Sequence, residues 1–168
     1  SMQRIKELAL QAANDSLTPA DRATVLQEVR QLGDSLVALA NTKNGDDYVF
    51  SGQQTRTPAF ASLGAPYGGD TQPIVARIAP SATTTINITG DVAWQPALTA
   101  VAQLVTDLGT GTGRPSTTTL QGLDDGFAAM LSQRTKLGAI QNRLADTRLF
   151  VGDQQDTATK LLSDLEDA

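Results

Sequence analysis

Few residues in this chain could do chemistry, because histidine and cysteine are both absent. Their absence removes thiolate metal sites, cysteine nucleophiles, serine–histidine–aspartate triads and imidazole acid–base catalysis. Carboxylates, lysines, tyrosines and hydroxyls remain. The carboxylates of Asp124, Asp125 and Asp164 lie in helical stretches without any sign of a pocket that would adapt them to catalysis. The sequence therefore predicts no enzyme, no metal site and no cofactor.

Three short motifs resemble known sites without their context. "GTGTGRPS", residues 109–116, follows a helix instead of a strand and has Arg114-Pro115 where a phosphate loop needs lysine. "NGDD", residues 44–47, lacks the alternating ligands and distant glutamate of a calcium loop. "NIT", residues 87–89, matches a glycosylation sequon but is also typical of a strand. We interpret them as an interhelical loop, a solvated turn and a strand.

The composition limits the class of protein. With 168 residues, 40% of them hydrophobic, the chain can bury a core as one domain or two small ones. A net charge of −5 repels phosphate backbones and anionic lipid, so neither nucleic acid nor a membrane surface is expected as a partner. The sequence also contains neither an apolar run near the ~20 residues of a membrane span nor a cleavable signal.

Apolar spacing predicts two helices in the first quarter of the chain. Ile5, Leu8, Ala9 and Ala12 form one stripe, which predicts a helix over residues 3–13. After a break at residues 14–17, Thr18-Pro19-Ala20-Asp21 is close to a capping box and predicts the start of a second helix. This helix should end near residue 41, with a heptad seam of Val25, Val29, Leu32, Leu36 and Leu39.

Helical spacing returns after residue 95. A short helix is predicted over residues 96–108, and a long one over residues 120–166 that begins after Ser116 or a neighbouring threonine as N-cap. The long helix has one apolar residue every seven positions: Leu123, Met130, Leu137, Leu144, Val151, Ala158 and Leu165. At 1.5 Å per residue it would span ~70 Å, whereas a compact chain of this size is about 40 Å across. We therefore expect a rod, unless Gly138 or Gly152 kinks the helix. The first helical pattern starts without a cap and the last one stops without a cap, so we expect a core taken from a longer protein.

A hairpin signal follows the second helix in "NTKNGDDYVFSG", residues 41–52. Asn44-Gly45 predicts a tight type I′ turn with two positive φ angles, and Tyr48-Val49-Phe50 predicts a short strand. We expect this hairpin to reverse the chain at the end of the bundle, with Tyr48 and Phe50 packed against it.

Residues 53–93 differ in composition from the helical parts. β-Branched or alternating runs at residues 74–78 and 84–89 predict strands. The predicted fold is α+β and mainly α: an elongated antiparallel helical rod with a β-hairpin and a small inserted β domain. The rod comprises residues 1–52 and 94–168, and the insert comprises residues 53–93.

Both helical parts resemble a known superfamily. "MQRIKELALQAAND" and "LSQRTKLGAIQNRLADT" are similar to the N-terminal and C-terminal cores of bacterial flagellins and their relatives. The second stretch matches the pattern Arg-x-x-x-Gly-Ala-x-x-Asn-Arg-Leu at Arg134, Gly138, Ala139, Asn142, Arg143 and Leu144. The hairpin "YVFSG" and the insert more closely resemble the hook-filament junction family, the third hook-associated proteins. The resemblance covers residues 1–52 and 94–168.

The resemblance implies a structural subunit that is exported unfolded and acts outside the cell in the bacterial flagellum. Implied partners are the first hook-associated protein, flagellin, further copies of the chain and an export chaperone. The implied terminal helices, absent here, would form a coiled-coil tube, and the isolated core is expected to be monomeric. Interface positions implied by the resemblance are Arg4, Leu8, Glu28, Arg134, Gly138, Asn142 and Arg143.

Two other functions are compatible with the sequence. The chain could be a flagellin that builds the filament itself; Arg4, Leu8 and Glu28 match positions by which an innate immune receptor recognises some flagellins, although the same positions serve subunit packing. Alternatively, it could be a secreted binding module whose β insert holds a ligand. A pocket lined by Tyr67 and Trp94 would favour this second alternative.

Overall fold

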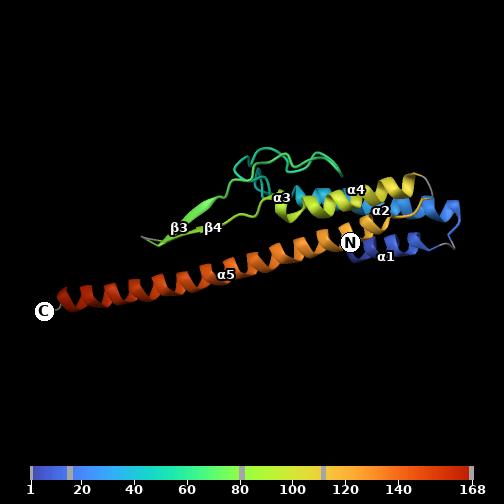
Figure 1. Cartoon of the computed structure of the whole chain (residues 1–168). Helices are drawn as coiled ribbons and strands as arrows, with labels where there is room; N and C mark the ends of the chain where they lie inside the picture. Colours follow the sequence, from blue (N-terminus) through green and yellow to red (C-terminus); the bar gives the residue numbers. More distant parts are fainter. Residues whose placement is uncertain (1, 15–16, 80–81, 111–112, 167–168) are drawn as a thin grey trace.

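The computed structural model describes the whole chain except residues 1, 15–16, 80–81, 111–112 and 167–168. Four helices alternate in direction in an elongated bundle, and the last of them continues far beyond the other three (Figure 1). They are α1 (Met2–Ala13), α2 (Pro19–Ala40), α4 (Gln95–Gly109) and α5 (Thr117–Glu166). A one-turn helix, α3 (Gly90–Ala93), precedes α4. The predicted fold class, a mainly helical antiparallel rod with small β elements, is confirmed.

The predicted start of α2 is confirmed in detail. The backbone N–H of Asp21 donates to Oγ1 of Thr18 at 3.2 Å, and the backbone N–H of Thr18 donates to Oδ2 of Asp21 at 3.2 Å. This reciprocal capping box satisfies two of the donors that a helix start leaves free. Proline at the first helical position then needs no hydrogen-bond acceptor.

The buried stripe of α2 differs from the predicted seam at its end. Val25, Val29 and Leu36 are buried as expected, but Leu39 is 51% exposed and Ala40 is fully buried instead. A straight α-helix has 3.6 residues per turn, so a strict 3.5-residue seam drifts off the buried face within a few turns. The stripe follows the straight helix through Gly33 to Ala40.

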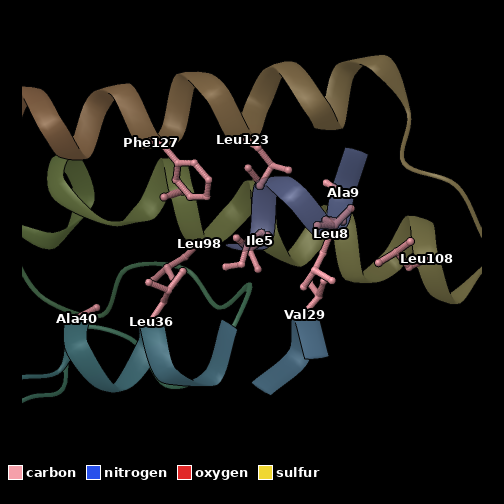
Figure 2. Packing of buried hydrophobic residues seen from close by; sticks show 14 of the residues in the cluster. Ile5, Leu8, Ala9, Val29, Leu36, Ala40, Leu98, Leu108, Leu123 and Phe127 are labelled. Carbon is pink, nitrogen blue, oxygen red and sulfur yellow. The ribbon is translucent and has the colours of Figure 1, made fainter. Parts of the chain in front are cut away.

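The bundle has one continuous core. Ile5 and Leu8 of α1, Leu98 of α4 and Leu123 and Phe127 of α5 point into the space between the helices (Figure 2). The closest approach lies between α4 and α5, where a Cβ added to Gly126 would stand 2.7 Å from Cα of Ala97. Glycine at this position therefore sets the distance between these two helices.

Arg22 binds both connections at one end of the bundle, the one from α1 to α2 and the one from α4 to α5. Its Nη1 donates to the carbonyl oxygens of Ala12 at 2.9 Å and Gly113 at 3.0 Å, and its Nη2 donates to that of Asn14 at 3.2 Å. One guanidinium thus binds the end of α1 and the connection from α4 to α5. The predicted interhelical loop at 109–116 connects these helices, although its residues 111–112 lie outside the described part.

The hairpin after α2 is shorter than predicted. Strands β1 (Lys43–Asn44) and β2 (Asp47–Tyr48) pair antiparallel, with Asn44 opposite Asp47. Asn44 is therefore a strand residue, and the turn is made by Gly45 and Asp46. Only Gly45 has a positive φ, 63°, so the predicted type I′ turn with two positive φ angles is wrong. The predicted strand also ends at Tyr48 and does not include residues 49–50.

The inserted segment is attached to the bundle by its first half. The side-chain amide of Asn41 donates to the carbonyl of Phe60 at 2.6 Å and accepts from its N–H at 3.0 Å. Ala59 and Phe60 are buried in the same core as the helices. Residues 53–74 contain no described strand.

The second half of the insert is a two-stranded ribbon, β3 (Val75–Ala79) and β4 (Ala82–Thr85). The strand predicted at 74–78 is confirmed with a shift of one residue, whereas the one predicted at 84–89 ends at Thr85. Ile86 still donates to the carbonyl of Ile74, but Asn87 then accepts the N–H of Ile74 through its side chain at 2.8 Å. A side chain that replaces a backbone partner in this way ends the ladder.

Helix α5 runs unbroken through its 50 residues, so neither Gly138 nor Gly152 kinks it (Figure 1). Its predicted apolar column is buried at Leu123 and half-buried at Met130, but Leu165 is 76% exposed. No residue of α5 after Phe127 is buried. We call residues 131–166 the α5 overhang.

Candidate interaction surface

The residues that the resemblance places at an interface fall into two groups. Arg4 and Glu28 join α1 to α2 through two hydrogen bonds, Nε to Oε1 at 2.6 Å and Nη2 to Oε2 at 3.1 Å. Arg4 also lies 3.5 Å from Glu7. Leu8, in contrast, is 1% exposed in the core and cannot contact a partner directly.

The electrostatics of this first group follow from its geometry. The hydrogen bond from Arg4 lowers the pKa of Glu28; burial opposes this effect, and the positive charge of Arg4 adds to it. The hydrogen bond to Glu28 and the negative charge of Glu28 raise the pKa of Arg4. Both groups are therefore ionised at neutral pH, and the pair presents a fixed, solvent-facing charge pattern across the two helices.

The second group, Arg134, Gly138, Asn142 and Arg143, lies on the α5 overhang. A Cβ added to Gly138 would meet no atom within 4 Å, so nothing in the described chain requires glycine there. The side chains of Arg134, Asn142 and Arg143 are exposed and make no hydrogen bond or ion pair with another described residue. The structure thus does not bring this group into contact with Arg4 and Glu28.

The hairpin residues have distinct surroundings. The ring of Phe50 meets the ring of Trp94 edge to face, with centroids 5.6 Å apart. The ring of Tyr48 lies 4.5 Å below the ammonium of Lys43. Arg56, which the sequence analysis did not single out, approaches Asp46 at 3.4 Å and Asp47 at 3.1 Å. Nothing local connects residue 56 with the turn, because the contact depends on how the insert folds back.

An apolar hollow of about 220 Å³ lies where the hairpin, the start of α4 and α5 meet. Its lining includes Met2, Phe50, Trp94, Met130 and Leu137. Tyr67 is not among the lining residues, because its ring packs on Phe60 and its hydroxyl hydrogen-bonds the carbonyls of Phe50 and Asp70. The hollow that Trp94 lines is therefore not lined by Tyr67 as well, as the ligand-binding alternative would require.

The titratable groups of the described residues form no catalytic cluster. Burial raises the pKa of Tyr67, against a backbone hydrogen bond with Gly90 and with help from the carboxylates of Asp91 and Asp70. Tyr67 is therefore a neutral hydrogen-bonding group at physiological pH.

Among the residues that the structure describes, no group of three or more carboxylates could hold a metal ion, and no helix is long and apolar enough to cross a bilayer.

The overhang exposes large apolar side chains that lie outside the predicted seven-residue column. They are Leu131 at 55%, Leu149 at 70%, Phe150 at 60%, Leu161 at 60% and Leu162 at 61%. The seven-residue spacing could not indicate them. Several large apolar groups in solvent on one helix indicate an interaction surface.

Sequence comparison and fold comparison with known proteins give consistent results. No family model matches the chain. Flagellar hook-associated protein 3 of Escherichia coli (strain K12) is 33% identical over 92 residues, which are 54% of this chain and 29% of that protein. The protein of the same name from Salmonella typhimurium (strain LT2) is 28% identical over 91 residues, again 54% and 29% of the two chains. Each alignment thus spans less than a third of the relative.

The fold agrees over nearly the whole chain. The crystal structure of flagellar hook associated protein-3 from Legionella pneumophila superposes with a TM-score of 0.85 at 17% identity, and the match covers 99% of this chain and 88% of that one. At this identity the likeness concerns the fold alone, and the sequence relatives supply the evolutionary link. The resemblance inferred from the two helical motifs is confirmed. The chain is a homologue of flagellar hook-associated protein 3.

Proposed function

We propose that this chain is the core of a structural subunit that joins the flagellar hook to the filament. The observation that carries the proposal is the α5 overhang, which exposes Leu149, Phe150, Leu161 and Leu162 on a helix that no other described element encloses. A helical rod with such a surface can bind neighbouring subunits along its length. Many modest contacts, repeated by symmetry, then supply the strength of the assembly.

The partners follow from the homology and from the resemblance in the sequence. Flagellar hook-associated protein 3 is named for its association with the hook, and the junction family implies the first hook-associated protein on one side and flagellin on the other. We propose the same neighbours for this chain, together with copies of itself, in the flagellum outside the cell. The role is mechanical and needs no catalytic site.

Gly138 provides a specific contact point for this proposal. Glycine inside an exposed helix costs about 1 kcal/mol relative to alanine, and no atom of the described chain lies near its missing side chain. Close approach of a neighbouring subunit would explain why this position lacks a side chain. Arg134, Asn142 and Arg143, one turn before and after it, would contact the same neighbour.

Deleting the gene in the source bacterium tests the proposed role. We expect intact hooks, few filaments and flagellin released into the medium, and restoration of filaments by the full-length gene on a plasmid. Normal filaments in the deletion strain would contradict the proposal. Filaments that are lost together with their hooks would point to an earlier step of assembly and would also contradict it.

The full-length Gly138→Leu variant tests the contact point in the same strain. We expect this variant to be exported but to support fewer filaments than the wild type. Ala139→Leu, at a neighbouring position about 100° around the helix, is the matched control. Equal filament numbers for the two variants would exclude a special role of Gly138.

A further inference from the structure

The ribbon of the insert, β3 and β4, runs along the first part of the α5 overhang (Figure 1). Its two faces differ in exposure. Ala76 and Thr84, which pair across the strands, are half-buried. The neighbouring pairs on either side are exposed: Val75 with Thr85, and Arg77 with Thr83. Successive residues of a strand point to opposite faces, so one face of this ribbon is covered and the other faces water.

Helix α5 is covered where the ribbon lies beside it. Of residues 141–166, which the structure describes without a gap, only Leu144, Thr147 and Gly152 are half-buried, and the rest are exposed. These three residues line a space of about 390 Å³ together with Ile78 of β3, which is itself half-buried. Beyond residue 140, α5 is therefore shielded from water only beside the ribbon.

The covered side of α5 is its seven-residue apolar column. Three members of the column lie beside apolar residues of the insert: Leu137 beside Ile86 and Ile88, and Leu144 and Val151 beside Ile78. Past the ribbon the column is open to water, because Leu165 is 76% exposed. The ribbon thus takes the place of the partner helices for the part of the column that leaves the bundle.

We propose that the ribbon supports the α5 overhang over residues 137–152 and that this contact attaches the insert to the rod a second time. The first attachment is the pair of hydrogen bonds between Asn41 and the backbone of Phe60. The second is mutual. A two-stranded ribbon is marginally stable by itself in water, and a helix without packing contacts opens readily. Each element therefore stabilises the other by covering its apolar side.

The base of the ribbon is held by side-chain hydrogen bonds. Asn87 accepts the N–H of Ile74 at 2.8 Å and donates to the carbonyl of Gln72 at 3.4 Å. The side chain of Gln53 donates to the carbonyl of Pro73 at 3.2 Å, which connects this base to the first half of the insert. With its base held in this way, the ribbon reaches α5 as a continuation of the insert. A displacement of the insert then moves the overhang directly, and not only through the bundle.

Hydrogen exchange of α5 in ribbon variants tests the support. Ile78→Asp places a carboxylate on the covered face, where contact with α5 would remove it from water, so the ribbon should leave the helix. We expect the amides of residues 141–152 to exchange at least about tenfold faster, as in a helical segment that has lost its packing. Val75→Asp puts the same residue on the outer face of the same strand, at a position that is 54% exposed, and should change these rates less than about twofold.

The same measurement contains its own control for folding. The amides of residues 117–130 lie in the part of α5 that packs on the core, and their exchange should stay unchanged in both variants. The contact belongs to the single chain, so its test needs no assembled flagellum and leaves the proposed role untouched. Unchanged protection of residues 141–152 in Ile78→Asp, or equal effects of the two variants, would overturn the proposal.

Exchange of the ribbon in variants of α5 tests the contact from the other side. Leu144→Ala removes an apolar group of the column, whereas Leu149→Ala removes one that is 70% exposed and lies about 140° around the helix. Alanine and leucine are both good helix formers, so neither variant should disturb α5 itself. We expect faster exchange at residues 74–78 in Leu144→Ala and not in Leu149→Ala. A ribbon that exchanges equally in both variants would show that it does not depend on α5.

Discussion

Asp107 near the end of α4 holds Thr119 in the first turn of α5. Its Oδ2 accepts a hydrogen bond from Oγ1 of Thr119 at 2.6 Å and another from the backbone N–H of Ser116 at 2.8 Å, while Oδ1 accepts from Gln103 at 2.8 Å. Ser116 itself caps the helix by accepting the N–H of Thr119 at 3.1 Å. One carboxylate thus connects the two helices at the start of the longest element.

Replacing this carboxylate should loosen the start of α5. In Asp107→Asn the side chain has one acceptor oxygen instead of two, so at least one of the three donors loses its partner. We expect a loss of about 1–3 kcal/mol in the free energy of unfolding, the usual cost of losing a hydrogen bond to a charged group. Urea unfolding followed by circular dichroism measures it. Asp125→Asn, an exposed carboxylate on α5, is the control and should be nearly neutral.

The same variant should change how stability depends on pH. Burial alone would raise the pKa of Asp107, but the hydrogen bonds from Ser116, Thr119 and Gln103 outweigh it and lower the pKa below the ordinary value of 3.8. The folded state therefore holds its proton less tightly than the unfolded state, so this contribution is present above pH 4 and is lost as the pH falls through the folded pKa. Urea midpoints from pH 6 down to pH 2 should fall less steeply in Asp107→Asn than in the wild type. Identical slopes would show that the carboxylate is not linked to folding.

Alanine at two glycines of the same helix should have opposite effects. At Gly126 a Cβ would stand 2.7–3.0 Å from backbone atoms of Ala97 and Pro96, which cannot move without shifting α4. Gly126→Ala should therefore lower the melting temperature despite the better helix propensity of alanine. At Gly138 the space is open, so Gly138→Ala should stabilise the isolated chain by up to about 1 kcal/mol. Differential scanning calorimetry compares them, and a destabilised Gly138→Ala would show that glycine is needed there within the chain.

Two neighbouring positions of α1 should differ strongly in their effect on stability. Leu8→Ala empties a site that is 1% exposed in the core and should cost about 2–5 kcal/mol. Arg4→Ala breaks an exposed ion pair with Glu28 and should cost much less. Chemical unfolding of both variants measures the difference. Similar losses would mean that the pair between α1 and α2 contributes far more than exposed pairs usually do.

Amide hydrogen exchange should divide α5 into two regions. The amides of residues 117–130 belong to the turns that pack on the core and should exchange slowly. Those of the overhang have few packing contacts to prevent local opening, so they should exchange faster, and fastest towards residue 166. Mass spectrometry of proteolytic peptides resolves the two regions. Uniform protection along α5 at low protein concentration would contradict this expectation.

Local chemistry made part of the fold predictable. The stripe of Ile5, Leu8, Ala9 and Ala12 and the capping box of Thr18 and Asp21 depend on residues within two turns of one another, so their spacing alone indicated them. The seven-residue column of α5 predicted the length of that helix. It did not predict where burial stops, because that depends on where the partner helices end.

Contacts between distant residues could not be predicted. Asn41 binds the backbone of Phe60 across nineteen positions, and Arg22 binds the carbonyl of Gly113 across ninety-one. The sequence position of an asparagine or an arginine does not indicate which distant carbonyl it will bind.

The turn residues of the hairpin were also predicted wrongly. An Asn-Gly pair is compatible with a turn made by both residues and with a turn that begins at the glycine, and the sequence alone does not distinguish the two.

The close contact of Gly126 with Ala97 gives the overhang a mechanical meaning. The overhang is about 54 Å long and the packed part of α5, residues 117–130, about 21 Å, at 1.5 Å per residue. A sideways load at the tip acts on the bundle as through a lever, with its fulcrum near the last core residues of α5. By the ratio of the two lengths, the force that holds the far end of the packed part, near residue 117, is roughly 2.5 times the load at the tip. Because Gly126 has no Cβ, the backbones of α4 and α5 can pack closely at Ala97, and this close packing resists bending of α5 at the edge of the bundle.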